Sequence, residues 1–130
     1  MAVKLMIFGA RALQGTLLHT RLDDLRAAGI QFAVIGTERD SREIENTGLI
    51  LSTALVGTAS EEQALTEMNN LIKGFTSRVQ AKPSEVMVVG DSELYHLAAR
   101  SQHVSWSSAR GLDILLSRAK SVEEALEFIS

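Results

Sequence analysis

Apolar residues follow two alternating patterns along this chain of 130 residues. Short, nearly continuous apolar runs, each bounded by turn residues, occur at residues 3–8, 31–35, 49–56, 86–89 and 104–106. Runs of this length are typical of strands that are buried on both faces of a parallel sheet. Between them lie longer stretches in which apolar residues recur every three or four positions, as they do in amphipathic helices.

Local signals mark where the predicted helices begin and end. The first helix covers residues 16–28, and Gly29 then supplies the left-handed conformation that ends many helices. Ser60 has a glutamine three residues further on, which is the spacing of a capping box, and it starts the next helix. Two more helices are predicted to start near residues 91 and 121.

The alternation of strands and helices predicts an α/β fold, with a doubly wound parallel sheet of about five strands and helices on both faces. The length fits a single domain, residues 1–130. Ligands of such folds bind outside the carboxyl ends of the strands. Candidate site residues therefore follow the predicted strands, near residues 9–11, 36–40, 57–58 and 90–92.

Composition narrows the classes of function. The chain has a net charge of -3, so it lacks the basic excess that neutralises nucleic-acid phosphates. It has no cysteine, which excludes disulfides, thiolate zinc sites and a cysteine nucleophile. No stretch approaches the roughly 20 apolar residues that cross a bilayer. We therefore expect a cytoplasmic protein whose partners include neither nucleic acid nor a membrane.

The segment around the fourth apolar run carries a more specific pattern. An apolar strand that ends in Gly90-Asp91-Ser92 and continues into a helix with two alanines resembles motif IV of the haloacid-dehalogenase-like (HAD) superfamily. The helix and strand over residues 22–35, the strand at 103–106 and the tail at 109–126 are similar to HAD segments in order and spacing. The resemblance covers residues 4–129 and implies a HAD-like, Rossmann-like three-layer sandwich without a cap domain.

The aspartates that the resemblance implies for catalysis are mostly absent. The family has a nucleophilic aspartate and an acid/base aspartate after the first strand, where this chain has Gly9 and Arg11. Asp91 of motif IV is kept, but Tyr95 stands at the second acidic position. Glycine cannot form an aspartyl-phosphate. An arginine repels Mg²⁺ but suits a phosphate or carboxylate.

Two further HAD positions bear on the same interpretation. Thr37 fits motif II, whose hydroxyl binds the phosphoryl group, and Thr58 stands where motif III has a lysine. Lys73 or Lys82 could supply that lysine from elsewhere in the chain, and the sequence leaves this question open. Together with the missing aspartates, these positions favour a degenerate HAD-like domain that is catalytically inactive and acts as a binding or interaction module.

For this module we expect a small anion or phosphorylated ligand, a protein partner or a second copy of the chain. The candidate ligand-binding residues are Gly9, Arg11, Thr37, Asp91 and Ser92. No cofactor is expected. The alternative is a magnesium-dependent phosphoester hydrolase with non-standard residues, in which Asp91 would be the metal ligand. Without such a role, Asp91 would cap the start of its own helix, and Arg11 would be a solvated surface residue.

A second alternative is a Rossmann-type nucleotide-binding protein. The stretch from Gly9 to Gly15 resembles a glycine-rich phosphate loop in which Ala12 replaces the middle glycine. Glu38 and Asp40 follow the second predicted strand, where such proteins have an acidic residue for the ribose. If the loop has no such function, the two glycines would only allow a tight turn between strand and helix.

Overall fold

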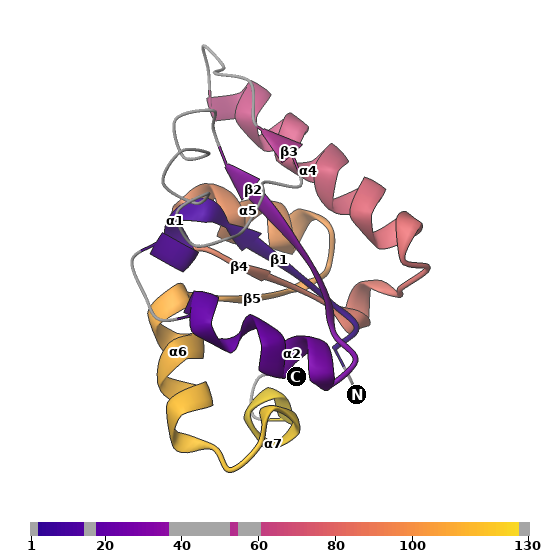
Figure 1. The fold of residues 1–130 in the computed structure, drawn as a ribbon. Coiled ribbons are helices and arrows are strands. Elements are labelled where there is room, and N and C mark those ends of the chain that lie inside the picture. Colours follow the sequence, from indigo (N-terminus) through magenta and orange to yellow (C-terminus); the bar gives the residue numbers. More distant parts are fainter. Residues whose placement is uncertain (1–2, 15–17, 37–52, 55–60, 128–130) are drawn as a thin grey trace.

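The computed structural model describes residues 3–14, 18–36, 53–54 and 61–127. Its centre is a sheet of parallel strands in the order β3-β2-β1-β4-β5 (Figure 1). The strands are β1 (Leu5–Gly9), β2 (Gln31–Gly36), β3 (Thr53–Ala54), β4 (Val86–Val89) and β5 (Ser105–Ser107). The predicted α/β class with a parallel sheet is confirmed.

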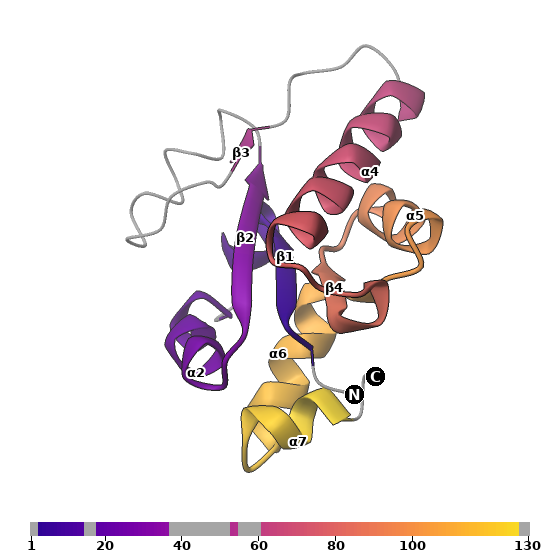
Figure 2. The ribbon, with the colours of Figure 1, turned by 90° about the vertical axis from the view of Figure 1, so that its right-hand side faces the viewer.

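Helical segments connect the strands and cover the sheet. They are α1 (Ala10–Gln14), α2 (Leu22–Ala27), α4 (Glu61–Arg78), α5 (Glu93–Ser101), α6 (Ala109–Arg118) and α7 (Val122–Glu127), with 3₁₀ turns η1 (Leu18–Arg21) and η2 (Pro83–Glu85). Two buried clusters show that the helices form two layers. One cluster joins the sheet to α1, α2, α6 and α7, and the other joins it to α4 and α5 (Figure 2).

Strand β1 explains why the apolar runs are continuous. All of its residues are buried. Met6 and Phe8 belong to the cluster with α1 and α2, whereas Leu5 and Ile7 belong to the cluster with α4 and α5. Side chains of a strand point alternately to opposite faces, so a strand between two helical layers needs apolar residues at every position.

The register of β1 positions the candidate site. Phe8 is paired with Val34 of β2 on one side and with Val89 of β4 on the other. The carboxyl ends of β1 and β4 are therefore neighbours. The strand order also reverses between these two strands, because the chain moves outward from β1 through β2 on one side and from β4 through β5 on the other. This is the place at which ligands bind in doubly wound sheets.

The helices depart from the prediction in three places. The predicted helix over residues 16–28 is interrupted, because residues 18–21 form the 3₁₀ turn η1 and α2 begins only at Leu22. The turn predicted after Gly9 is the short helix α1, which buries Ala12 and Leu13. Helix α6 was not predicted as a helix. Gly29 does adopt the expected left-handed conformation, with φ 86°. The start of the helix at Ser60 and most of the run at 49–56 lie outside the described residues.

Candidate functional site at the carboxyl ends of β1 and β4

The aromatic ring of Tyr95 lies against the glycines that end the two central strands. A Cβ atom at Gly9 would lie 2.8 Å from Cζ and 2.8 Å from Oη of Tyr95. A Cβ atom at Gly90 would lie 2.6 Å from Cδ2 and 2.7 Å from Cγ of the same ring. These distances are too short for real carbon contacts, so only glycine leaves room for the ring at either position. The ring of Tyr95 therefore occupies the space next to both strand ends.

Tyr95 reaches this position from α5. The helix begins after Ser92, and its buried alanines, Ala98 and Ala99, pack in the cluster that contains β4 and α4. Tyr95 is half-buried and packs against that cluster. In the sequence, Tyr95 stood out only because it replaces the second acidic residue of motif IV. The one available signal was a pair of glycines at the ends of adjacent strands, which requires a close approach by some other group.

Asp91 has a structural partner in a neighbouring helix. Its Oδ1 accepts a hydrogen bond of 2.9 Å from the backbone N–H of Ala109, at the start of α6. Ser108 is the N-cap of α6, and its Oγ accepts from the N–H of Gly111 at 3.1 Å. These two bonds satisfy two of the N–H groups that a helix start leaves unpaired. The carboxylate also lies at the positive end of the helix.

This arrangement corrects the expectation that Asp91 caps its own helix. The N-cap of α5 is Ser92, which makes no side-chain capping bond. Asp91 instead connects the end of β4 to α6, eighteen positions further along the chain. Such a bond could not be predicted from local spacing, because it depends on how β4 and β5 lie next to each other.

Trp106 and His96 lie beside the same strand end. Trp106 Nε1 donates a hydrogen bond of 3.0 Å to the carbonyl oxygen of Gly90. Its ring is stacked on that of His96, with 4.3 Å between the ring centroids and 16° between the planes. The indole therefore holds the backbone just after β4 while its face is covered by the imidazole.

The structure brings together only some of the predicted site residues. Gly9, Asp91 and Ser92 lie at the same edge of the sheet, and Gly9 is buried there. Arg11 is exposed on α1. Thr37 lies outside the described residues, as do Thr58 and the second glycine of the predicted phosphate loop.

The two candidate substitutes for the motif III lysine lie elsewhere. Lys82 precedes η2 and β4, so it lies at the opposite, amino-terminal edge of the sheet. Lys73 is exposed on α4. Within the described part of the chain, no lysine follows β1, β4 or β5 directly, where it could face the strand ends.

A magnesium site at the strand ends would need oxygen ligands from the residues that follow β1 and β4. Mg²⁺ requires octahedral oxygen ligands, usually including one or two carboxylates. Among the described residues, no group of three or more His, Asp or Glu side chains could hold a metal ion. Asp91 already accepts a bond from Ala109, and the ring of Tyr95 occupies the space beside Gly9 and Gly90. The described residues at this edge do not fit a magnesium ion.

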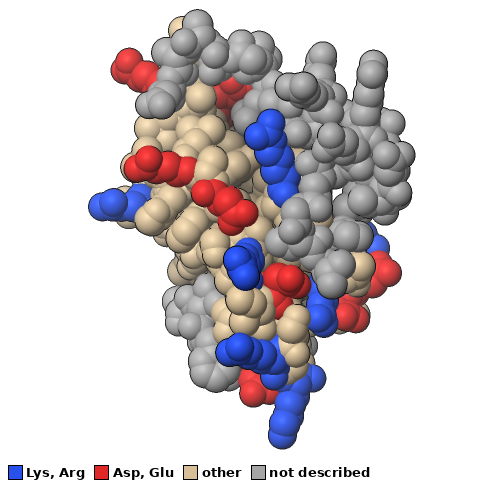
Figure 3. Space-filling model, turned by 90° about the vertical axis from the view of Figure 1, so that its left-hand side faces the viewer, with Lys and Arg blue, Asp and Glu red and all other residues tan. Residues whose placement is uncertain are grey.

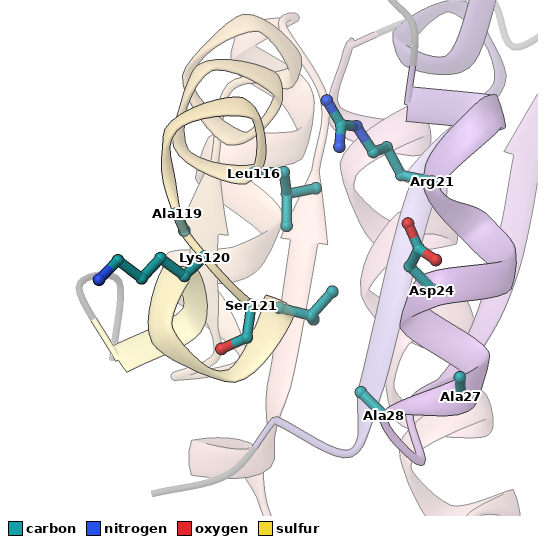
Figure 4. Close-up of a pocket in the computed structure, with 9 residues that line it drawn as sticks. Arg21, Asp24, Ala27, Ala28, Leu116, Ala119, Lys120 and Ser121 are labelled. Atoms are coloured by element: carbon teal, nitrogen blue, oxygen red, sulfur yellow. The ribbon is translucent and has the colours of Figure 1, made fainter.

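Two cavities lie between helices of the described part of the chain, and the first includes Ser92, close to the end of β4. One of about 530 Å³ lies between α4 and α5. The other, of about 400 Å³, lies between α2 and the α6–α7 pair (Figure 4). In the second cavity Arg21 donates to Ser117 Oγ at 3.0 Å, and Lys120 points away from the cavity. The charged side chains on its α2 wall are Arg21 and Asp24, and Arg21 is engaged by the hydrogen bond to Ser117.

The charges on the face over α1, α2 and α6 are mixed. Among the described residues of this face, Lys and Arg side chains lie beside Asp and Glu side chains (Figure 3). Within the described part of the chain, no helix has the length and apolar character needed to cross a membrane.

Neither a comparison with protein-family models nor one with curated proteins finds a match to this chain. The class of this protein therefore follows from its fold and from the geometry of its strand ends. It is an α/β protein with a parallel, Rossmann-like sheet whose central strand ends are covered by one of its own aromatic side chains.

Proposed function

We propose that this chain is a degenerate HAD-like domain without a cap, which does not hydrolyse phosphoesters and acts as a binding or interaction module. The observation that supports the proposal most is the contact of the Tyr95 ring with Gly9. The HAD resemblance assigns the nucleophile to position 9, and this position has neither a carboxylate nor room for one beside the ring.

The chemistry of the strand ends supports the same conclusion. Covalent phosphoryl transfer requires a nucleophilic side chain. General acid–base catalysis adds a factor of about 10²–10⁴ in rate, and it requires a group that can exchange protons. Gly9 supplies neither function. An arginine, the residue at position 11, is unsuited to proton transfer, and the Asp91 carboxylate supports α6.

The same contact argues against the nucleotide-binding alternative. A phosphate loop brings backbone N–H groups and a helix start against a pyrophosphate. Here the chain passes from β1 directly into α1, and the space next to Gly9 contains the ring of Tyr95. Gly15, Glu38 and Asp40, on which this alternative also depends, lie outside the described residues.

The proposal is tested by magnesium binding and phosphoester turnover. We expect no turnover by the wild type, and no magnesium binding by the wild type or by Gly9→Asp/Arg11→Asp, because Tyr95 obstructs an aspartate at position 9. Adding Tyr95→Ala should allow magnesium binding, measured by calorimetry. The matched control is Gly9→Asn/Arg11→Asn/Tyr95→Ala, which has similar side-chain shapes without the carboxylates. Circular dichroism verifies that each variant is folded.

Two results would contradict this proposal in different ways. Magnesium-dependent turnover by the wild type that disappears in Asp91→Asn would show that the domain is an active hydrolase. A folded Gly9→Asp/Arg11→Asp/Tyr95→Ala variant that binds no magnesium would show that the strand ends do not have the HAD geometry.

A further inference from the structure

Two large apolar side chains are exposed among the described residues, and they lie on opposite sides of the sheet. Leu97 of α5 is 41% exposed and Ile114 of α6 is 43% exposed. Helix α5 packs in the cluster with α4, whereas α6 packs in the cluster with α1 and α2. A single exposed leucine or isoleucine needs no explanation. Here, however, acidic side chains lie near Leu97 and arginines lie near Ile114, so the two surfaces have complementary charges.

Leu97 lines the cavity of about 530 Å³ between α4 and α5. We call this cavity the α4–α5 groove. Its apolar lining consists of Ala64, Leu65, Leu94 and Leu97, and its polar lining consists of Glu62, Ser92 and Glu93. The size is within the range of ligand pockets, about 300–1,000 Å³. The groove therefore combines an apolar surface with two acidic side chains.

Ile114 lies between two arginines on the surface of α6. Arg110 and Arg118 are four residues before and four residues after it, so the three side chains lie along one face of the helix. Both arginines are exposed. Their Cα atoms are separated by about 12 Å, from a rise of about 1.5 Å per residue. We call these three residues the α6 ridge.

The charges of the two surfaces are opposite and unpaired within the described part of the molecule. Glu62 and Glu93 are exposed beside the groove, and neither forms an ion pair with another described residue. The same holds for Arg110 and Arg118 on the ridge. Each surface thus presents apolar area together with charges that the other could neutralise.

We propose that the partner of the α4–α5 groove is a second copy of this chain, which inserts its α6 ridge. Ile114 of one copy would lie against Leu97 and its apolar neighbours in the next, with the arginines facing Glu62 and Glu93. A helix that places apolar residues in a groove is a common mode of recognition. This inference deepens the interaction part of the proposed function, and it holds whether or not the strand ends are catalytic.

The geometry determines the type of assembly. The groove and the ridge are different surfaces on opposite sides of the sheet, so the contact is heterologous. Each bound copy still presents one free groove or one free ridge, and association continues into a ring or an open chain of copies. A symmetric dimer, in which each copy presents the same surface, is not expected.

Sedimentation of two single variants tests the proposal. The weight-average mass of the wild type should rise with concentration. Leu97→Lys places a positive charge in the groove, opposite the arginines of the ridge, and Ile114→Asn places an uncharged polar amide on the ridge, so each variant should stay monomeric. A mixture of the two should form a 1:1 dimer and nothing larger, because only one intact groove and one intact ridge remain. Ser77→Lys and Gln31→Asn are matched controls at exposed positions elsewhere and should associate like the wild type.

The remaining outcomes would overturn the proposal. A wild type that stays monomeric up to about 1 mM, where the binding free energy would be only about -4.1 kcal/mol, excludes association of copies. If such a monomer bound a basic amphipathic peptide, the groove would belong to a different partner. Association that survives in either variant would assign the contact to another surface. A mixture of the folded variants that stays monomeric would exclude the pairing of groove with ridge.

Discussion

The two edges of the sheet at β1 and β4 are stabilised in different ways. At the amino-terminal edge, Lys4 Nζ lies 3.0 Å from Glu85 Oε2, and Glu85 Oε1 accepts a bond of 2.9 Å from the backbone N–H of Lys82. The backbone N–H of Lys4 also donates to the carbonyl oxygen of Glu85 at 2.8 Å. At the carboxyl-terminal edge, the ring of Tyr95 lies on Gly9 and Gly90.

This difference indicates where the fold tolerates change. The charged side chains of Lys4 and Glu85 at the amino-terminal edge are partly exposed, so water can replace the contacts that a substitution there removes. The contact at the carboxyl-terminal edge is between an aromatic ring and backbone, and it depends on the absence of a side chain. The edge that carries the ligand in most folds of this class is therefore the sterically stricter edge in this protein.

The largest expected effect is that of Gly90→Ala. The new methyl group would lie 2.6 Å from the Tyr95 ring, and such overpacking costs about 1–3 kcal/mol in the free energy of unfolding. Urea denaturation measures this loss. In a Tyr95→Ala background the same substitution should cost less, because the obstructing ring is gone.

Gly74→Ala is the matched control for this prediction. Gly74 lies within α4, and a Cβ atom there meets nothing within 4 Å. The substitution should therefore stabilise the protein, by about 1 kcal/mol from helix propensity. Equal costs of Gly90→Ala with and without the Tyr95 ring would show that the ring does not require the glycine.

A smaller effect is expected at Asp91. Asp91→Ala removes the acceptor for the N–H of Ala109 at the start of α6, and the loss of a capping bond costs about 0.5–2 kcal/mol. Asp91→Asn keeps an acceptor oxygen and loses only the charge near the helix start, which is worth about 0.3–1 kcal/mol. Urea denaturation should rank the alanine variant as the less stable of the two.

Ser92→Ala is the control for Asp91. Ser92 makes no side-chain capping bond, so its substitution should change the free energy of unfolding by less than about 0.5 kcal/mol. If Ser92→Ala were as costly as Asp91→Ala, the bond to Ala109 would not be the source of the stability.

The smallest effect is expected at the amino-terminal edge and depends on pH. The hydrogen bond from the backbone of Lys82 and the ammonium group of Lys4 lower the pKa of Glu85 below its ordinary value of 4.5. A carboxyl group with a lowered pKa stabilises the folded state above its unfolded pKa, and this contribution is lost as the pH falls through the folded value. Wild type should therefore be more stable than Glu85→Gln at neutral pH.

Urea midpoints at neutral pH and at about pH 3 measure this difference, which should shrink as the carboxyl group becomes protonated. In a Lys4→Gln background the difference at neutral pH should be smaller, because one of the two groups that lower the pKa is missing. A difference between wild type and Glu85→Gln that did not change with pH would have a cause other than the charge of Glu85.

The sheet was predictable because its signal is local. Each residue of the run Val86–Val89 is buried, and the predicted strand has the observed bounds. Gly29 is also a local signal, because a glycine after a helix commonly adopts the left-handed conformation. It has this conformation in the structure. Helix α1 was missed because it has only five residues, too few for an apolar period to be recognised in the sequence.

The candidate site was only partly predictable, because its main contacts join distant segments. The sequence indicates where the strands end. The edge of the sheet and the place of the glycines at positions 9 and 90 could therefore be predicted. The ring of Tyr95 on Gly9, and the bond from Ala109 to Asp91, depend on the order of strands and on the packing of α5 and α6. These two contacts could not be predicted from the spacing of residues along the chain.

The central position of β1 has a consequence for synthesis of the chain. Strand β1 is paired with β2 on one side and with β4 on the other. A ribosome therefore releases β1 long before its second neighbour exists, and at about 5–20 residues per second that interval lasts several seconds. During it, one edge of a fully apolar strand lacks its native partner. The nascent chain is thus most exposed to aggregation, and most in need of a chaperone, before Val89 has left the ribosomal tunnel.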